Sequence, residues 1–164
     1  DRAWQRTLDG EPQARPWGWA DTWPVARLRV ERLGIDQVVL AGASGSSLAF
    51  GPGHLDGTVL PGQAGNAVVG GHRDTHFRFL ADLVPGDELV VDDASGGEHH
   101  FVVTDARVVD SRSSGVSLAS AKPALTLVTC YPFDAVIPGG SQRYVVLAEP
   151  VECDDALTDT TGCG

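Results

Sequence analysis

The chain is 164 residues long, enough for a single domain to bury a core without disulfide or metal staples, and we expect one domain. Its net charge of -10 and its single lysine, Lys122, exclude a nucleic-acid-binding surface, which needs clustered basic side chains. No apolar run approaches the roughly 18 residues of a membrane span, and the absence of methionine leaves room for an N-terminal signal or anchor that has been removed.

Residues 1–22 form a predicted N-terminal arm. All four tryptophans lie within the first 24 residues among several prolines, which predicts an irregular or partly helical segment laid over the domain. The simplest role for these indoles is packing rather than ligand binding. From Val25 the pattern changes, because Ala26, Leu28 and Val30 alternate with charged residues. This period of two is typical of a half-buried strand.

Short strands dominate the rest of the chain. Apolar stretches bounded by turn formers predict strands at 37–40, 66–71, 88–91, 100–109, 125–130 and 142–149. Brief helical segments are expected around 48–50, at 77–83 and within 113–121, whereas 51–65 should be loop with at most a short strand. Short strands without long crossover helices indicate an all-β fold, a closed eight-stranded barrel, rather than a doubly wound α/β sheet.

Three polar residues stand at the ends of predicted strands. Cys130 closes the run 125–130, Arg143 opens the next run, and His72 follows directly after 66–71. If the last two runs pair as a hairpin with Cys130 opposite Arg143, their side chains leave the same face with Cβ atoms roughly 4.5–5.5 Å apart. We therefore expect the three residues to converge.

These residue types suit nucleophilic catalysis. A cysteine attacks carbonyl groups as its thiolate, and it needs neighbours that stabilise negative charge and a group that carries the leaving amine's proton. His72 can carry that proton. Arg143 stays protonated, so its roles would be substrate binding and oxyanion stabilisation. The alternative is that Cys130 is only a small buried apolar residue, as cysteines at strand ends commonly are.

The number of cysteines, three, leaves at least one unpaired within the chain. Cys153 and Cys163 lie in a polar tail, where they either bridge each other or remain exposed thiols. Cys130 is the candidate free thiol in both cases.

The sequence resembles a known family. Its residues 126–130, T-L-V-T-C, match the T-L-x-T-C signature of sortases, the cysteine transpeptidases that join secreted proteins to bacterial surfaces, and His72 and Arg143 match as well. Further matches in the same order are F-G-P-G-H at 50–54, L-P-G at 60–62, the run 65–75 and L-V-P-G-D at 83–87.

The likeness covers residues 23–151, which would be the catalytic domain between the arm and a polar tail at 152–164. The short loop between Cys130 and Arg143, with its pair of glycines at 139–140, looks most similar to Gram-negative, marine-type sortases, with class D and E enzymes next.

The resemblance implies a sortase-type barrel with Cys130 as nucleophile, His72 as general acid and then base, and Arg143 as the clamp for substrate and oxyanion. It implies cleavage of the Thr-Gly bond in an L-P-x-T-G-like C-terminal sorting signal of a secreted protein, through a thioacyl intermediate, and transfer to an amine acceptor. No cofactor is expected.

The resemblance also implies an extracytoplasmic enzyme whose parent protein is membrane-anchored, on the periplasmic face if the source is Gram-negative. The alternatives are a cysteine hydrolase that does not transfer its product and a non-catalytic peptide-binding barrel. The oligomeric state stays open.

Two further residues are candidates for substrate binding. His54 matches a histidine in the family's G-P-G-H segment, with a loop histidine bonded to backbone as the alternative, and Thr129 adjoins the nucleophile. We expect no metal, because His72 and His76 lack the glutamate of the H-E-x-x-H zinc motif. The acidic residues of the hairpin 92–98 could attract calcium or form a solvated tip.

Overall fold

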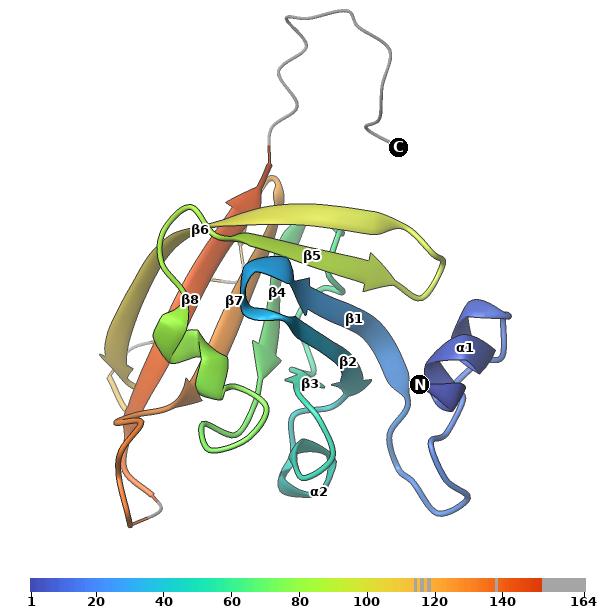
Figure 1. The fold of residues 1–164 in the computed structure, drawn as a ribbon, viewed down its shortest axis with the longest axis horizontal. Coiled ribbons are helices and arrows are strands. Elements are labelled where there is room, and N and C mark those ends of the chain that lie inside the picture. The colour runs from blue at the N-terminus through green and yellow to red at the C-terminus, as the bar shows by residue number, and fades with distance from the viewer. Residues whose placement is uncertain (114, 116, 118, 138, 152–164) are drawn as a thin grey trace, which may run out of the picture.

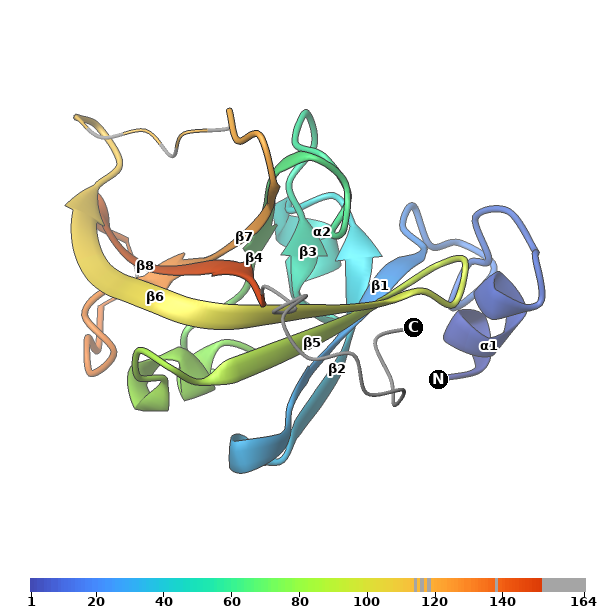
Figure 2. The same cartoon turned by 90° about the horizontal axis from the view of Figure 1, so that it is seen from above.

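The computed structural model describes residues 1–151 apart from 114, 116, 118 and 138. Eight strands close into one barrel in the order β1-β2-β3-β4-β7-β8-β6-β5 (Figure 1). In Figure 2 the long strand β6 curves around one side of the barrel, and the arm with α1 lies at the far side from β8. The predicted all-β fold, a closed eight-stranded barrel with short helices, is confirmed. The tail at 152–164, with Cys153 and Cys163, lies outside the described residues.

The strands in chain order are β1 Pro24–Val30, β2 Ile35–Ala41, β3 Gly53–His54, β4 Gly65–Gly70, β5 Glu88–Asp93, β6 Glu98–Asp110, β7 Pro123–Cys130 and β8 Gln142–Pro150. The helical segments are α1 Arg2–Leu8, η1 Glu31–Leu33, α2 Gly45–Leu48 and η2 Arg78–Asp82. The loop expected at 51–65 contains the two-residue strand β3, and its last residue, Gly65, already begins β4. Within 113–121 the described residues form no helix.

The core lies inside the barrel because one face of each strand is apolar. In β1 buried and half-buried residues alternate, with Ala26, Leu28 and Val30 inside. Leu127 of β7 and Phe77, which precedes η2, are fully buried. Each large apolar side chain contributes roughly 1.5–3 kcal/mol to folding by leaving water.

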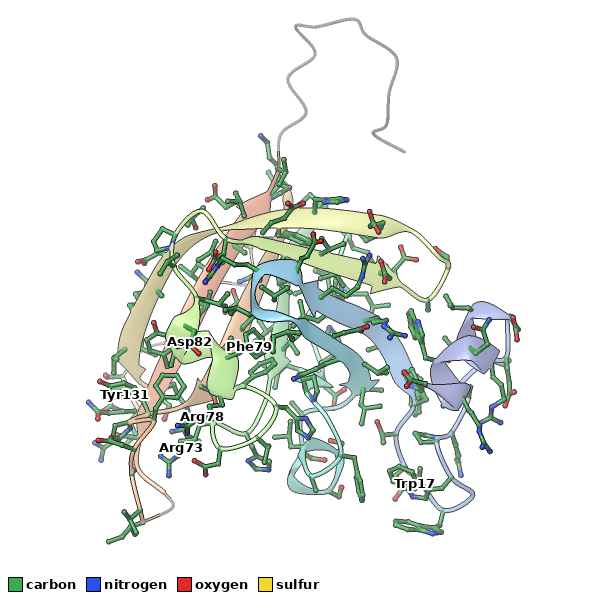
Figure 3. All side chains as sticks on the ribbon, in the orientation of Figure 1. Trp17, Arg73, Arg78, Phe79, Asp82 and Tyr131 are labelled. Carbon is green, nitrogen blue, oxygen red and sulfur yellow. The ribbon has the colours of Figure 1, made fainter. Side chains whose placement is uncertain are left out.

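The arm packs on the barrel near β1 and β2. Trp4 of α1 is buried at 4% exposure, and the ring of Trp17, labelled in Figure 3, lies 4.4 Å from that of Phe50 and 5.3 Å from that of Trp19. Trp19 is 75% exposed. The predicted packing role therefore fits Trp4, which is buried, and does not fit Trp19, which is mostly exposed.

Paired charges cover the hairpin formed by β5 and β6. Arg29 of β1 contacts Asp92 at 2.7 Å, and this hydrogen bond raises the pKa of the guanidinium. Burial alone would raise the pKa of Asp93, but hydrogen bonds from Ser95 and His99 outweigh it and lower that pKa. The tip is therefore tied together by its own side chains. Among the described residues, no group of three or more His, Cys, Asp and Glu side chains could hold a metal ion.

In the part of the chain that the structure describes, none of the helices combines the length and the apolar character needed to cross a membrane.

Candidate active site

Two strand pairings bring Cys130, Arg143 and His72 to one end of the barrel. β7 and β8 are antiparallel, with Cys130 opposite Arg143. β4 and β7 are parallel (Figure 1), with Gly70 opposite Val128. Both parallel chains continue for two residues beyond that pair, so His72 and Cys130 leave the sheet at matching levels.

The hairpin pairing predicted for Cys130 and Arg143 is confirmed, and Cys130 is a free thiol. Odd-numbered residues of β7, such as Leu127, belong to the core. Because side chains alternate along a strand, Cys130 lies on the outer face of the barrel. The chemical roles of the three residues stay predictions.

The three side chains line one cavity of about 600 Å³. Cys130 and Arg143 are half-buried, and His72 is exposed. The rest of the wall is mainly aliphatic, formed by Ala43, Leu48, Leu55, Val68, Val109, Val128 and Val145. An outer sheet face is usually polar when only water covers it, so an aliphatic wall around a thiol is typical of a ligand-binding surface. In the sequence, this signal lay in the valines of the predicted strands that fall on the same face as Cys130, such as Val128 two residues before it.

The segment that carries His72 is fixed to the core by close packing. A Cβ atom at Gly71 would lie 2.6 Å from the ring of Phe77, which is fully buried. The backbone N–H groups of Phe77 and Thr75 donate to the carbonyl of His72, at 2.9 and 3.3 Å. A side chain at position 71 would therefore force the Phe77 ring to shift, and the turn after Gly71 presents the imidazole outward.

The guanidinium of Arg143 is held by its own loop. Its Nη1 donates to the carbonyl oxygens of Gly140 and Gln142, at 2.8 and 2.9 Å. Within the described residues, the Nε and Nη2 groups of Arg143 have no hydrogen-bond acceptor. One edge of the guanidinium is thus anchored, and N–H groups remain for a ligand in the cavity.

The two predicted substrate-binding residues lie in different surroundings. Thr129 lines the cavity, but it is 2% exposed and its hydroxyl donates to the Gly71 carbonyl at 2.7 Å. His54 is 7% exposed on β3, and its Nε2 lies 2.8 Å from the Val59 carbonyl and 3.0 Å from the Thr58 hydroxyl. The structure does not place His54 among the residues that line the cavity, and its bond to backbone matches the alternative considered for it.

Arg73 was not predicted as a functional residue. It is 6% exposed, and its Nη1 and Nη2 donate to the carbonyls of Pro132 and Ala135, at 2.9 and 3.0 Å. These carbonyls lie in the loop that follows Cys130. The only signal in the sequence was the position of Arg73 next to His72, because nothing local shows that an arginine in a loop will be buried.

The sequence model of the family described as the Sortase domain matches residues 28–151 of this chain. The chain belongs to the sortase family. Sortase D of Bacillus subtilis (strain 168) is a relative with 30% identity over 125 residues, which cover 76% of this chain and 62% of that protein. The family predicted from the T-L-x-T-C motif is confirmed.

Solved sortase structures share the fold. Sortase A from Corynebacterium diphtheriae superposes with a TM-score of 0.72 and 26% identity, covering 84% of this chain and 65% of that one. Sortase C-1 from Actinomyces oris gives a TM-score of 0.69 and 29% identity, covering 79% and 74%. The chain spans less than two thirds of the length of Sortase D and of the Corynebacterium sortase A.

Proposed function

We propose that this member of the sortase family is a cysteine transpeptidase, with Cys130 as the nucleophile, His72 as the proton carrier and Arg143 as the clamp for the substrate and its oxyanion. The observation that carries the proposal is the pairing of Cys130 with Arg143 in a cavity that His72 also lines. Family membership and the sortase A, C and D relatives support the reaction class.

The first step forms a thioester. The thiolate of Cys130 attacks the carbonyl carbon of the Thr-Gly bond in an L-P-x-T-G-like signal, and the carbonyl oxygen takes up negative charge. The proposed role of the free N–H groups of Arg143 is to donate to that oxygen. As the C–N bond breaks, His72 gives its proton to the departing glycine amine, and the threonine acyl group stays on Sγ.

The second step consumes the thioester. An acceptor amine attacks the acyl carbon, His72 takes the amine's proton, and the C–S bond breaks to restore the Cys130 thiolate. The product is a new amide. If water attacks instead, the same intermediate is hydrolysed. The alternative function is therefore a cysteine hydrolase without transfer, and the group that attacks the thioester, amine or water, decides between the two.

The cavity supports an apolar peptide as substrate. Val68, Val128 and Val145 lie on three neighbouring strands next to the candidate nucleophile, and such a wall suits the leucine and proline of the signal better than charged side chains. The substrate would be a secreted protein with a C-terminal sorting signal. The parent of this chain would act outside the cytoplasm and be membrane-anchored. The named relatives are of classes D, A and C, so the marine-type or class D/E assignment stays a prediction.

A fluorogenic series of L-P-x-T-G-like peptides tests the proposal. We expect cleavage to vanish in Cys130→Ala and to fall by about 10²–10⁴-fold in His72→Ala and by about 10²–10³-fold in Arg143→Ala. Arg112→Ala is the matched control for Arg143→Ala, because Arg112 is an exposed arginine paired with Asp110 and does not line the cavity. Its cleavage rate should equal that of the wild type.

The outcomes separate the three functions. A ligated product, found by mass spectrometry after an amine is added, identifies a transpeptidase, whereas a hydrolysed product alone identifies the hydrolase. Peptide binding without any cleavage across the series would identify a non-catalytic barrel. Cleavage that persists in Cys130→Ala would overturn the assignment of the nucleophile.

A further inference from the structure

We propose that Arg73 is a positioning residue that holds His72 in place relative to Cys130. This inference rests on the proposed function, because it assigns a role within the same site. Arg73 touches neither the cavity nor the reacting atoms, so its effect on the chemistry would act through the two segments that it joins.

The contacts of Arg73 cross from one catalytic segment to the other. Its backbone directly follows His72 after β4, and its Nη1 and Nη2 bind the carbonyls of Pro132 and Ala135, 59 and 62 positions further along the chain. Pro132 is two residues beyond Cys130. In Figure 3 Arg73 lies near Tyr131, on the side of the barrel where the loop between β7 and β8 begins.

A second tie lies on the other side of His72. The N–H of Gly71 donates to the Val128 carbonyl at 3.1 Å, and the Thr129 hydroxyl donates to the Gly71 carbonyl at 2.7 Å. The chain that carries His72 is thus bonded to the chain that carries Cys130 both before the imidazole, through Gly71, and after it, through Arg73.

The His72 ring needs such support. Its side chain is exposed, and no described residue forms a hydrogen bond with the ring. The position of the ring therefore depends on the backbone. On the C-terminal side of His72, the contacts of Arg73 are the nearest link to the segment that carries Cys130. Since a misplacement of about 1 Å can lower a rate by about 10²-fold, a modest shift of this turn would be visible in catalysis.

The shape and burial of Arg73 favour this role over a simple surface charge. A guanidinium carries donors in a rigid fork and can bind two carbonyls at once, whereas a lysine ammonium is a point charge on a flexible stem. Its carboxylate neighbour Asp74 is 69% exposed and stands 3.5 Å from Nε. The buried carbonyl contacts, rather than this ion pair, therefore fix the guanidinium.

The experiment compares Arg73→Lys and Arg73→Ala with Arg78→Ala in the full chain. Arg78 is an exposed arginine of η2, labelled beside Arg73 in Figure 3, so its removal makes the same change in charge. With the best-cleaved peptide of the series, both Arg73 variants should lose about 10²-fold in kcat with little change in KM, because the peptide wall remains. Arg78→Ala should match the wild type.

Two readouts separate positioning from a loss of folding. Free guanidinium, at concentrations well below those that unfold proteins, should restore part of the kcat of Arg73→Ala and none of the kcat of His72→Ala. The rate at which iodoacetamide alkylates Cys130 should move in Arg73→Ala toward the rate in His72→Ala. A double change of both tail cysteines, Cys153→Ser and Cys163→Ser, leaves Cys130 as the only thiol in that assay.

The results decide between the two claims. Folded Arg73 variants with wild-type kcat would overturn the inference. A second pattern would also overturn it, because it means a purely structural role: a loss of kcat that guanidinium does not restore, together with a wild-type rate of Cys130 alkylation. If Arg73→Ala does not fold, Arg73→Lys decides by its kcat and alkylation rate. Activity that survives in Cys130→Ala would instead overturn the proposed function.

Discussion

The substitution Gly71→Ala tests how tightly the segment that carries His72 packs on the core. The added Cβ would lie 2.6 Å from Cγ of Phe77 and 2.8 Å from its Cδ1 and Cδ2, whereas carbon atoms prefer about 3.5–4.0 Å. Phe77 is fully buried, so its ring has no free space to move into. Overpacking of this kind costs about 1–3 kcal/mol, which lowers Tm by about 2–4 °C for each kcal/mol at this chain length.

Urea and thermal unfolding of Gly71→Ala, Phe77→Ala and the double variant measure this effect. Alanine at position 77 removes Cγ, Cδ1 and Cδ2, the ring atoms that the new methyl group would meet, so the cost of alanine at 71 should shrink by about 0.5–3 kcal/mol in the double variant. Gly18→Ala is the control, because its Cβ would meet no heavy atom within 4 Å, and it should change stability by less than about 0.5 kcal/mol. Equal costs of Gly71→Ala with and without the phenylalanine would refute the packing argument.

Three further substitutions probe other parts of the molecule. The hydrogen bond to Glu88 raises the pKa of His100. The pair therefore stabilises the fold below the usual imidazole pKa of about 6.5, and this contribution is lost as pH rises through the raised pKa of His100. The free energy of unfolding of the wild type relative to His100→Gln should therefore fall with rising pH, by less than about 1 kcal/mol because the pair is exposed; a flat difference would contradict this. Asn66→Ala removes a hydrogen bond to a carbonyl of the β6–β7 loop and leaves the buried Thr126 hydroxyl without its acceptor, so urea unfolding should show a loss of about 1–3 kcal/mol. Val128→Thr places a hydroxyl on the aliphatic wall of the cavity; peptide kinetics should show a higher KM with kcat little changed, and an unchanged KM would count against the proposed binding wall.

The fold could be predicted from the sequence where strands bury one face. The alternation around Leu28 and the apolar run ending at Cys130 placed β1 and β7, because a period of two over several residues is a strong signal. β3 could not be predicted as a defined strand, since Gly53–His54 is too short to show any period and forms only by pairing with β2 and β4. The exposure of Trp19 also depends on where the arm docks rather than on local sequence.

The candidate site could be predicted only in part. Cys130 and Arg143 were placed together because a hairpin register fixes which side chains share a face. The burial of Arg73 depends on two carbonyls that are distant in the sequence, and no local pattern encodes that contact. The surroundings of His54 depend on a hydrogen bond to the loop at Thr58 and Val59, so a motif match alone could not tell a cavity wall from a loop anchor.

The most direct test of the central claim is a rapid acid quench during turnover of an L-P-x-T-G-like peptide, followed by mass spectrometry of the intact protein and of its proteolytic fragments. We expect the acyl portion of the peptide as a thioester on the fragment that contains Cys130 in the wild type, and no adduct there in Cys130→Ala. Turnover of the peptide with no acyl adduct on Cys130, or with the adduct on Cys153 or Cys163, would contradict the account.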